Sequence, residues 1–91
     1  MSASAVQQEY LAEAYRLIQY QTGEPYITTS ALAERMNVSA PAVAAVIERL
    51  KRAGFVEHVR YHGMRLTSKG EREALMNIRR HRLTEVFLVN F

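Results

Sequence analysis

The amino-acid sequence predicts a winged helix-turn-helix, a mainly α-helical fold with one small β-hairpin. Three observations predict it: a short helical pattern over residues 28–36, a longer one over residues 40–54 after a tight turn, and two strand-like segments around Gly63 over residues 55–66. In such a module the second helix can lie in the major groove of DNA while the hairpin, called the wing, touches the backbone. The order of elements therefore favours a DNA-binding module over an enzyme.

A further helix is expected over residues 5–21, because apolar side chains recur there at helical spacing. Gly23 and Pro25 end it, since glycine tolerates a positive φ and proline biases the preceding residue away from the helical region. Residues 26–27 are expected to form a short strand that pairs with the wing. The apolar stripe of the helix consists of Val6, Tyr10, Leu11, Ala14, Leu17 and Ile18.

Capping residues delimit the two helices of the helix-turn-helix. A hydroxyl at Thr28 or Thr29 can accept a hydrogen bond from an unpaired first-turn N–H, and Ser39 can do the same for the next helix. Asn37 tolerates the left-handed conformation that ends the first of the two helices. Val38 is expected to anchor the turn in the core.

The first strand of the wing alternates between two faces. Phe55 and Val59 are expected to point inward, and Glu57 to face the opposite way from Val56 and His58. The polar segment that follows is expected to form the wing tip.

We expect residues 1–66 to form the winged helix-turn-helix DNA-binding domain and residues 67–91 to form a fourth helix, capped by Thr67. The last nine residues, LTEVFLVNF, are apolar almost all round. Leaving such a segment in water is unfavourable by roughly 1.5–3 kcal/mol per large side chain. We therefore expect that this end of the fourth helix docks on something, or that the chain has been cut.

The composition excludes several classes of function. The 91 residues include no cysteine, which excludes disulfides, zinc fingers and thiol catalysis and fits a reducing cytoplasm. No apolar run is long enough to span a bilayer, and the N-terminus lacks the basic and apolar regions of a signal peptide. We therefore expect a cytoplasmic protein with no membrane partner. The histidines have no cysteine or aspartate partners and no phosphate loop is present, so an enzyme is not expected.

Positive charge is concentrated in the second half of the chain. The formal net charge is +3, but residues 1–48 carry two basic and five acidic side chains, whereas residues 49–91 carry ten basic and four acidic ones. The second half can meet a phosphate backbone, although a solvated basic surface would look the same. Together with the helix-turn-helix pattern, this charge predicts double-stranded DNA as the partner. The expected DNA-binding residues are Thr29, Ser30, Ser39, Ala40, Pro41, Ala42, Ala44, Ala45, Arg49, Arg60, Tyr61 and Arg65.

The expected recognition helix is unusual for reading bases. Base edges are normally read by Arg, Lys, Asn or Gln, whereas the segment APAVAA offers only methyl and ring CH groups. These groups can touch thymine methyls, and backbone contacts and DNA shape would then supply much of the affinity. The alanines can equally be present because they favour helix formation. Arg60 and Arg65 of the wing are expected to contact phosphates, although an exposed polar turn needs no function.

Two pairs of residues with metal-ligand chemistry stand four apart in predicted helices: Glu9 with Glu13, and His81 with Glu85. Carboxylates and an imidazole can bind a hard divalent cation such as Mn²⁺. A glutamate near a basic group is more commonly part of a surface ion pair, and an isolated helical histidine is commonly solvated. Spacing alone leaves both interpretations open.

Three segments carry a family resemblance: LAERMNVSAPAV, the hairpin leading into LTSKGE, and RRHRLTEVFL. Over almost its whole length the chain resembles the N-terminal part of the iron- and manganese-dependent transcriptional repressors, of the diphtheria-toxin-repressor and manganese-transport-regulator type. The resemblance implies a homodimeric repressor of metal-homeostasis genes that binds palindromic operators when loaded with Fe²⁺ or Mn²⁺. The family's dimerisation helices and remaining metal ligands lie downstream of the matching region.

The resemblance also implies metal ligands. Glu9 occupies a ligand position at which the family has Met or Asp, His81 matches a histidine ligand, and Glu85 matches an acid of a second metal site. An oxygen at Glu9 suits Mn²⁺ better than a thioether would. The manganese branch has a further acid where this chain has Ala12, and the adjacent Glu13 points about 100° away on an ideal helix. The site is therefore expected to be incomplete in this chain.

For DNA recognition the resemblance is mixed. Ser39 and Pro41 match base-contacting positions of the family, whereas Ala42, Ala44 and Ala45 replace residues that are often polar. The alternative function is a winged helix used for protein–protein contact, with the apolar end of the fourth helix as its docking surface. The alanines favour this alternative, and the basic wing favours DNA.

Overall fold

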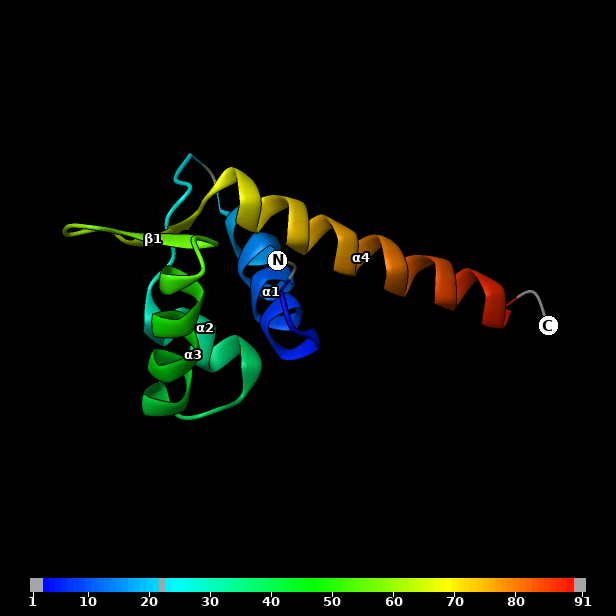
Figure 1. Cartoon of the computed structure of the whole chain (residues 1–91), viewed down its shortest axis with the longest axis horizontal. Helices are drawn as coiled ribbons and strands as arrows, with labels where there is room; N and C mark the ends of the chain where they lie inside the picture. Colours follow the sequence, from blue (N-terminus) through cyan, green and yellow to red (C-terminus); the bar gives the residue numbers. More distant parts are fainter. Residues whose placement is uncertain (1–2, 22, 90–91) are drawn as a thin grey trace.

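The computed structural model confirms the predicted fold class, with four helices and a two-stranded antiparallel hairpin in winged-helix order (Figure 1). It describes the backbone of residues 3–21 and 23–89, and the side chains of residues 3–21 and 23–82. The helices are α1 (Ala5–Tyr20), α2 (Thr29–Met36), α3 (Ala40–Arg52) and α4 (Ser68–Val89). The strands are β1 (Val56–Val59) and β2 (Gly63–Leu66).

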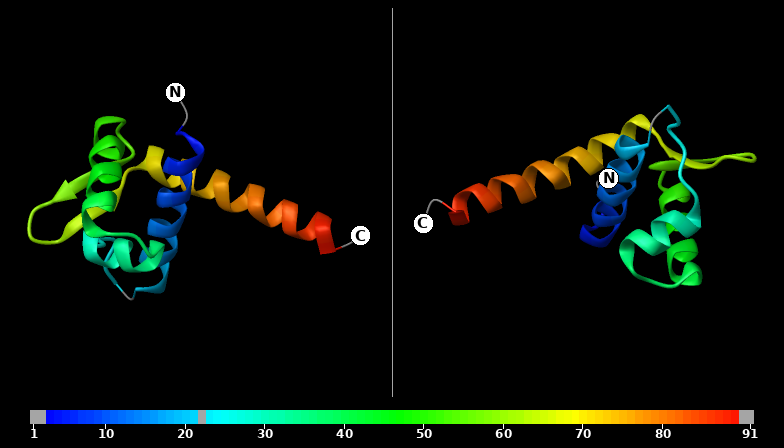
Figure 2. Two further views of the ribbon diagram at one scale, coloured as in Figure 1. Left: turned by 90° about the horizontal axis from the view of Figure 1, so that it is seen from below. Right: turned by 180° about the vertical axis from the view of Figure 1, so that it is seen from behind.

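Helix α1 lies between the other elements and packs against α4, α2 and β2 (Figure 1). The hairpin projects from one end of the molecule and the second half of α4 projects from the other, along a longest dimension of 47 Å (Figures 1 and 2). Within the described part of the chain, no other element lies alongside the last turns of α4. The wing and the end of α4 are thus presented on opposite sides of one small core.

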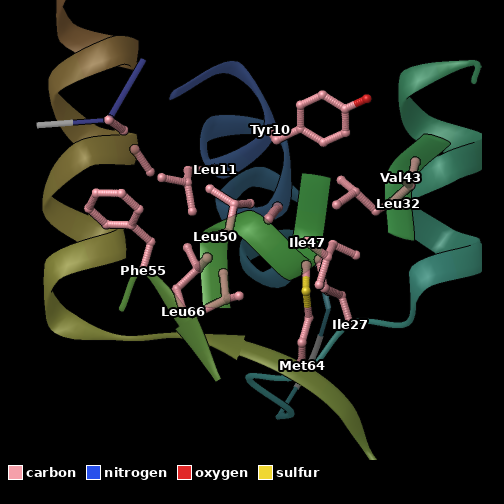
Figure 3. Packing of buried hydrophobic residues seen from close by; sticks show 14 of the residues in the cluster. Tyr10, Leu11, Ile27, Leu32, Val43, Ile47, Leu50, Phe55, Met64 and Leu66 are labelled. Atoms are coloured by element: carbon pink, nitrogen blue, oxygen red, sulfur yellow. The ribbon is translucent and has the colours of Figure 1, made fainter. Parts of the chain in front are cut away.

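Every helix and both strands contribute apolar side chains to this core. The largest fully buried side chains are Leu11 of α1, Leu32 of α2, and Val43 and Leu50 of α3. Figure 3 shows Leu11 and Leu50 among the side chains of the packed cluster. Burying each such side chain contributes roughly 1.5–3 kcal/mol, so this cluster holds the helix-turn-helix against α1.

The predicted caps are present at the two helices of the helix-turn-helix. Thr28 caps α2, because its Oγ1 accepts a hydrogen bond from the N–H of Ala31 at 3.0 Å. Ser39 caps α3 by accepting from the N–H of Ala42 at 3.3 Å. Asn37 closes α2 with φ 57° and ψ 45°, the left-handed conformation that its side chain tolerates. The capping residue Ser39 therefore fixes the position at which α3 begins.

A third chain segment extends the hairpin. Ile27 and Met64 exchange both backbone hydrogen bonds, each 2.9 Å long, which confirms the predicted pairing with the wing at Ile27. The pairing is an isolated bridge, and Tyr26 lies outside it. The backbones approach so closely that a Cβ on Gly63 would lie 2.3 Å from the carbonyl oxygen of Ile27. Gly63 also has φ 108°, a conformation that L side chains rarely adopt. Glycine is therefore required at this position to join the wing to the body.

Three valines do not lie where the sequence pattern predicts. Val38 is 40% exposed, because the core beneath the turn is filled by Leu32 and Val43 and the Val38 N–H closes the turn by donating to Ala33. Val6, in the first turn of α1, is 60% exposed.

Val56 is buried together with Phe55, so the predicted alternation is wrong at the start of β1. Phe55 precedes the strand and its backbone turns toward the start of α4, where its carbonyl accepts the N–H of Thr67 at 3.0 Å. The two neighbouring side chains are therefore covered by different elements.

Gly70 allows α4 to start close to the end of α3. A Cβ on Gly70 would lie 1.9 Å from the carbonyl oxygen of Phe55. We predict that Gly70→Ala lowers the free energy of unfolding by about 2–3 kcal/mol, because this backbone contact outweighs the gain of about 1 kcal/mol in helix propensity. Urea denaturation measures the change. Ser68→Ala, an exposed control in the same turn, should change it by less than about 0.5 kcal/mol; equal effects would contradict the close contact.

Candidate functional site

Helix α3 has one buried face and one exposed face. Val43, Ile47 and Leu50 are buried, whereas the residues expected to read DNA point into solvent. All twelve expected DNA-binding residues, in the first turn of α2, along α3 and in the wing, are exposed. The last turn of α3 adds the exposed basic residues Arg49, Lys51 and Arg52. The outward face of α3 is thus apolar at its start and positively charged at its end.

Backbone and hydroxyl groups at the two helix starts are arranged to meet an anion. Thr29 and Ser30 are the first residues of α2, where N–H groups have no partner within the helix. The oxygen of Ser39 accepts the cap bond of α3, which leaves its O–H to donate outward. These groups are the kind that hold phosphate oxygens at helix N-termini.

Aromatic contacts organise the wing tip. The guanidinium of Arg60 lies 4.9 Å from the centre of the Tyr61 ring, and Tyr61 has φ 70°. The ring of His62 stacks on that of Tyr26 with 4.8 Å between centres, so the loop before α2 supports the turn. Arg60 and Tyr61 both remain exposed.

The two wing arginines are not equivalent, although sequence reasoning treated them alike. Arg65 donates from Nε to Glu57 across the hairpin, and this hydrogen bond raises the pKa of Arg65. Glu57 neutralises much of the charge that Arg65 would present to a phosphate. Arg60 instead carries its charge at the tip, over a neutral ring.

A polar cleft of about 210 Å³ lies between α1 and α4. Glu9 and His81 face each other across it with 3.8 Å between Oε1 and Nε2, and both side chains are 55% exposed. The structure thus brings together two of the three expected metal ligands. The third, Glu85, has a side chain outside the described residues.

The donors in this cleft fit a divalent cation in kind but not in number. One carboxylate and one imidazole are suitable ligands for Mn²⁺ or Fe²⁺, which prefer about six. Ala12 lines the cleft without offering a donor. Among the described side chains, no three His, Cys, Asp or Glu residues are grouped so that they could hold an ion.

A buried polar network joins α1 to α4 next to Glu9 and His81. Glu73 of α4, only 7% exposed, accepts hydrogen bonds from the Ala3 N–H at 3.2 Å and from Gln8 Nε2 at 2.8 Å. Gln8 Oε1 in turn accepts from Arg80 at 2.7 Å. In the sequence, Gln8 directly precedes Glu9 and Arg80 directly precedes His81. Sequence reasoning missed this network, because its members are 65 and 72 residues apart and carry no local signal.

Glu13 lines the same cleft but is held by two arginines. Its Oε1 accepts from Arg16 Nη1 and its Oε2 from Arg35 Nε, each at 2.6 Å. Burial raises the pKa of Glu13, but the hydrogen bonds from Arg35 and Arg16 outweigh it and leave the pKa below the ordinary value of 4.5. Because Arg35 is in the last turn of α2, this ion pair ties α1 to the helix-turn-helix. The sequence did not indicate that Arg35 would pair with Glu13.

Comparison with known proteins identifies relatives that regulate transcription. Residues 3–64 match the family described as "Iron dependent repressor, N-terminal DNA binding domain". A helix-turn-helix transcriptional regulator of Methanocaldococcus jannaschii is 34% identical over 84 residues, which are 92% of this chain and 66% of that protein. The transcriptional regulator MntR of Lysinibacillus sphaericus is 30% identical over 81 residues, or 89% of this chain and 56% of MntR. The chain thus spans about half to two thirds of the length of these relatives.

Solved structures share the fold. FabT of Streptococcus pneumoniae in complex with DNA superposes with a TM-score of 0.77, at 21% identity, over 97% of this chain and 61% of FabT. The MepR–DNA complex of S. aureus gives 0.77 at 17% identity, over 97% of this chain and 63% of MepR. At such identities the likeness concerns the fold alone. In the described part of the chain, no helix is both long enough and apolar enough to cross a membrane.

Glu13 gives a prediction about acid stability. A carboxyl whose pKa is depressed by folding stabilises the fold above its unfolded pKa, and this contribution is lost as the pH falls through the folded pKa. We predict that Glu13→Gln lowers the free energy of unfolding by about 1 kcal/mol at pH 7. The difference from the wild type should shrink as the pH falls below the ordinary glutamate pKa of 4.5 and through the lower pKa of folded Glu13. Urea titrations at pH 7 and pH 3 measure this. The control Glu24→Gln, an exposed loop change, should alter neither value; a pH-independent loss at Glu13 would contradict the ion pair.

Proposed function

Because the chain belongs to the iron-dependent repressor family through that family's N-terminal DNA-binding domain, we propose that it is the DNA-binding part of a metal-responsive transcriptional repressor. The observation that carries the proposal is the joint exposure of the outer face of α3 and the wing. Positive groups flank this surface at the end of α3 and at the wing tip. Its relatives are transcriptional regulators rather than enzymes.

In the proposed complex with double-stranded DNA, α3 lies in the major groove. Its first turns, from Ser39 through Ala45, offer small side chains that allow close approach and can touch thymine methyls. Arg49 and the N-terminus of α2 meet the phosphates on either side of the groove, and Arg60 meets them from the wing. Specificity then depends strongly on DNA shape, since α3 presents no bidentate side chain in its first half.

For the metal response, we propose that Glu9 and His81 supply two ligands for Mn²⁺ or Fe²⁺. Such an ion would supply positive charge between α1 and α4, where Glu9 and His81 would hold it. The 3.8 Å separation and the polar lining of the cleft support this assignment. Glu85, one turn beyond His81 in α4, is proposed to serve the same ion or a second one.

The complete protein is proposed to be a cytoplasmic homodimer that binds palindromic operators of metal-homeostasis genes. The relatives' greater length supports a further domain, and residues 67–91 would begin the link to it. A dimer would bind two half-sites at once, and linking two modules can raise affinity by about 10²–10⁴-fold. The isolated chain should therefore bind DNA weakly.

The wing supplies the experiment that tests DNA binding. Each phosphate contact adds about 0.9 to the slope of log affinity against log salt. We predict that Arg60→Ala weakens binding to every duplex and lowers this slope by about one, and that Arg65→Ala lowers it by less because Glu57 already pairs with Arg65. Titration of a mixed-sequence 20-base-pair duplex at several salt concentrations measures the slope. Arg79→Ala, an exposed change of the same charge on α4, serves as the control. A slope that Arg60→Ala leaves unaltered would remove the wing from the backbone contacts.

The metal ligands are tested by Mn²⁺ titration of this chain, followed by the electron paramagnetic resonance signal of free Mn²⁺. We predict weak binding that falls by about tenfold or more in His81→Ala, by analogy with the effect of removing even the groups that orient ligands. His58→Ala, an exposed histidine of the wing, is the matched control and should bind as the wild type does. Equal Mn²⁺ affinity in the His81 variant and the wild type would leave His81 as an ordinary helix residue.

A further inference from the structure

We propose that Tyr61 is a positioning residue for DNA binding: its ring holds the guanidinium of Arg60 at the wing tip, in the place from which Arg60 meets a phosphate. The inference rests on the DNA contact of the wing proposed above. It accounts for a tyrosine in a backbone conformation that is unfavourable for the fold.

The turn at the wing tip contains a residue type that its geometry disfavours. The N–H of His62 donates to the carbonyl of Val59 at 3.0 Å, so residues 59–62 form a β-turn between β1 and β2. Tyr61 is the third residue of this turn and has φ 70°. Turns with a positive φ at that position ordinarily contain glycine or asparagine there, because the Cβ of other residues crowds the backbone. Tyr61 therefore strains the turn.

Contacts that follow Tyr61 in the chain hold the turn in this conformation. The ring of His62 stacks on the ring of Tyr26 with 4.8 Å between centres. The next residue, Gly63, lies directly against the backbone of Ile27. A strained backbone persists only where the surrounding structure fixes it, and such residues are concentrated at ligand-binding sites. The strain at Tyr61 thus points to a role outside the fold.

The side chain of Tyr61 contributes little to the folded core. Tyr61 is 87% exposed, so its ring buries almost no apolar surface. Its ring contacts the guanidinium of Arg60, which lies 4.9 Å from the ring centre. An exposed cation–π contact adds only modestly to stability. The pairing therefore matters more for where it places the charge than for the stability of the wing.

Stacking on a ring prepares a guanidinium for a phosphate. The contact uses the face of the planar group and leaves its in-plane N–H donors free for phosphate oxygens. The ring also restricts a long side chain before DNA is bound, so less conformational entropy is lost on binding. Within the described part of the chain Arg60 has no carboxylate partner, whereas Arg65 is paired with Glu57. Tyr61 thus orients the wing charge that no carboxylate neutralises.

The experiment is a double-mutant cycle between Arg60 and Tyr61 on the 91-residue chain, with the mixed-sequence 20-base-pair duplex as the probe. We expect Tyr61→Gly to weaken binding by about threefold to tenfold, the factor that corresponds to ordering one long side chain. The slope of log affinity against log salt should keep its wild-type value, because the charge of Arg60 is retained. In the Arg60→Ala background, Tyr61→Gly should have no effect on binding.

Two further variants separate the ring from its hydroxyl and from general aromatic contact. Tyr61→Phe keeps the ring and should bind DNA as the wild type does. The control Tyr20→Ala removes a tyrosine that is 79% exposed at the end of α1, and it should also bind as the wild type does.

Thermal unfolding without DNA tests the strain separately. In the Arg60→Ala background no cation–π contact is lost when Tyr61 is replaced. There Tyr61→Gly should raise the melting temperature by about 2–6 °C, because glycine adopts a positive φ without strain. Circular dichroism follows the transition and confirms that each variant is folded.

The outcomes distinguish this inference from the proposed function. Wild-type affinity in Tyr61→Gly, equal weakening in both Arg60 backgrounds, or a Tyr61→Phe variant as weak as Tyr61→Gly would overturn the positioning role while leaving the wing contact intact. A melting temperature that Tyr61→Gly fails to raise in the Arg60→Ala background would overturn it as well. A salt slope that Arg60→Ala leaves unaltered would instead remove the proposed DNA contact of the wing together with this inference.

Discussion

The packing of α1 against α4, α2 and β2 is the constraint on which the rest of the structure depends. Leu11 of α1 is fully buried and belongs to the same hydrophobic cluster as Leu50 of α3 (Figure 3). The buried carboxylate of Glu73 sets α4 against α1, and Glu13 sets α2 against α1. One helix therefore positions both the cleft between α1 and α4 and the helix-turn-helix.

Charge pairing decides which parts of the surface are available to a ligand. Arg65 and Arg35 are each paired with a carboxylate, whereas Arg60 rests on a neutral ring and keeps its full charge at the wing tip. Lys69, counted with the positive wing from the sequence, donates to the carbonyl of Ala53 and lies over the Phe55 ring, where it secures the start of α4. The net charge of the second half therefore overstates the number of groups free to meet phosphate.

Much of the candidate site could be predicted because it depends on short-range chemistry. The outward face of α3 follows from the cap at Ser39 and the period of its apolar residues, and both predictions agree with the structure. The approach of Glu9 to His81 agrees with the family resemblance, which implied that both residues are metal ligands. The partners of those residues could not be predicted, because Gln8, Glu73 and Arg80 meet only once α1 and α4 are packed.

The sequence by itself determined the order of elements, their caps and the left-handed turn at Asn37, since each depends on hydrogen bonds and backbone preferences within a few residues. It also determined the family. The tertiary structure decided which apolar residues are covered, because burial depends on the elements packed alongside. Val38 was expected in the core and is exposed, whereas Val56 was expected to face away from the core and is buried. It likewise decided that Arg35 holds Glu13. Ion pairs between residues far apart in the chain are set by the packing of whole helices, and no local pattern encodes that distance.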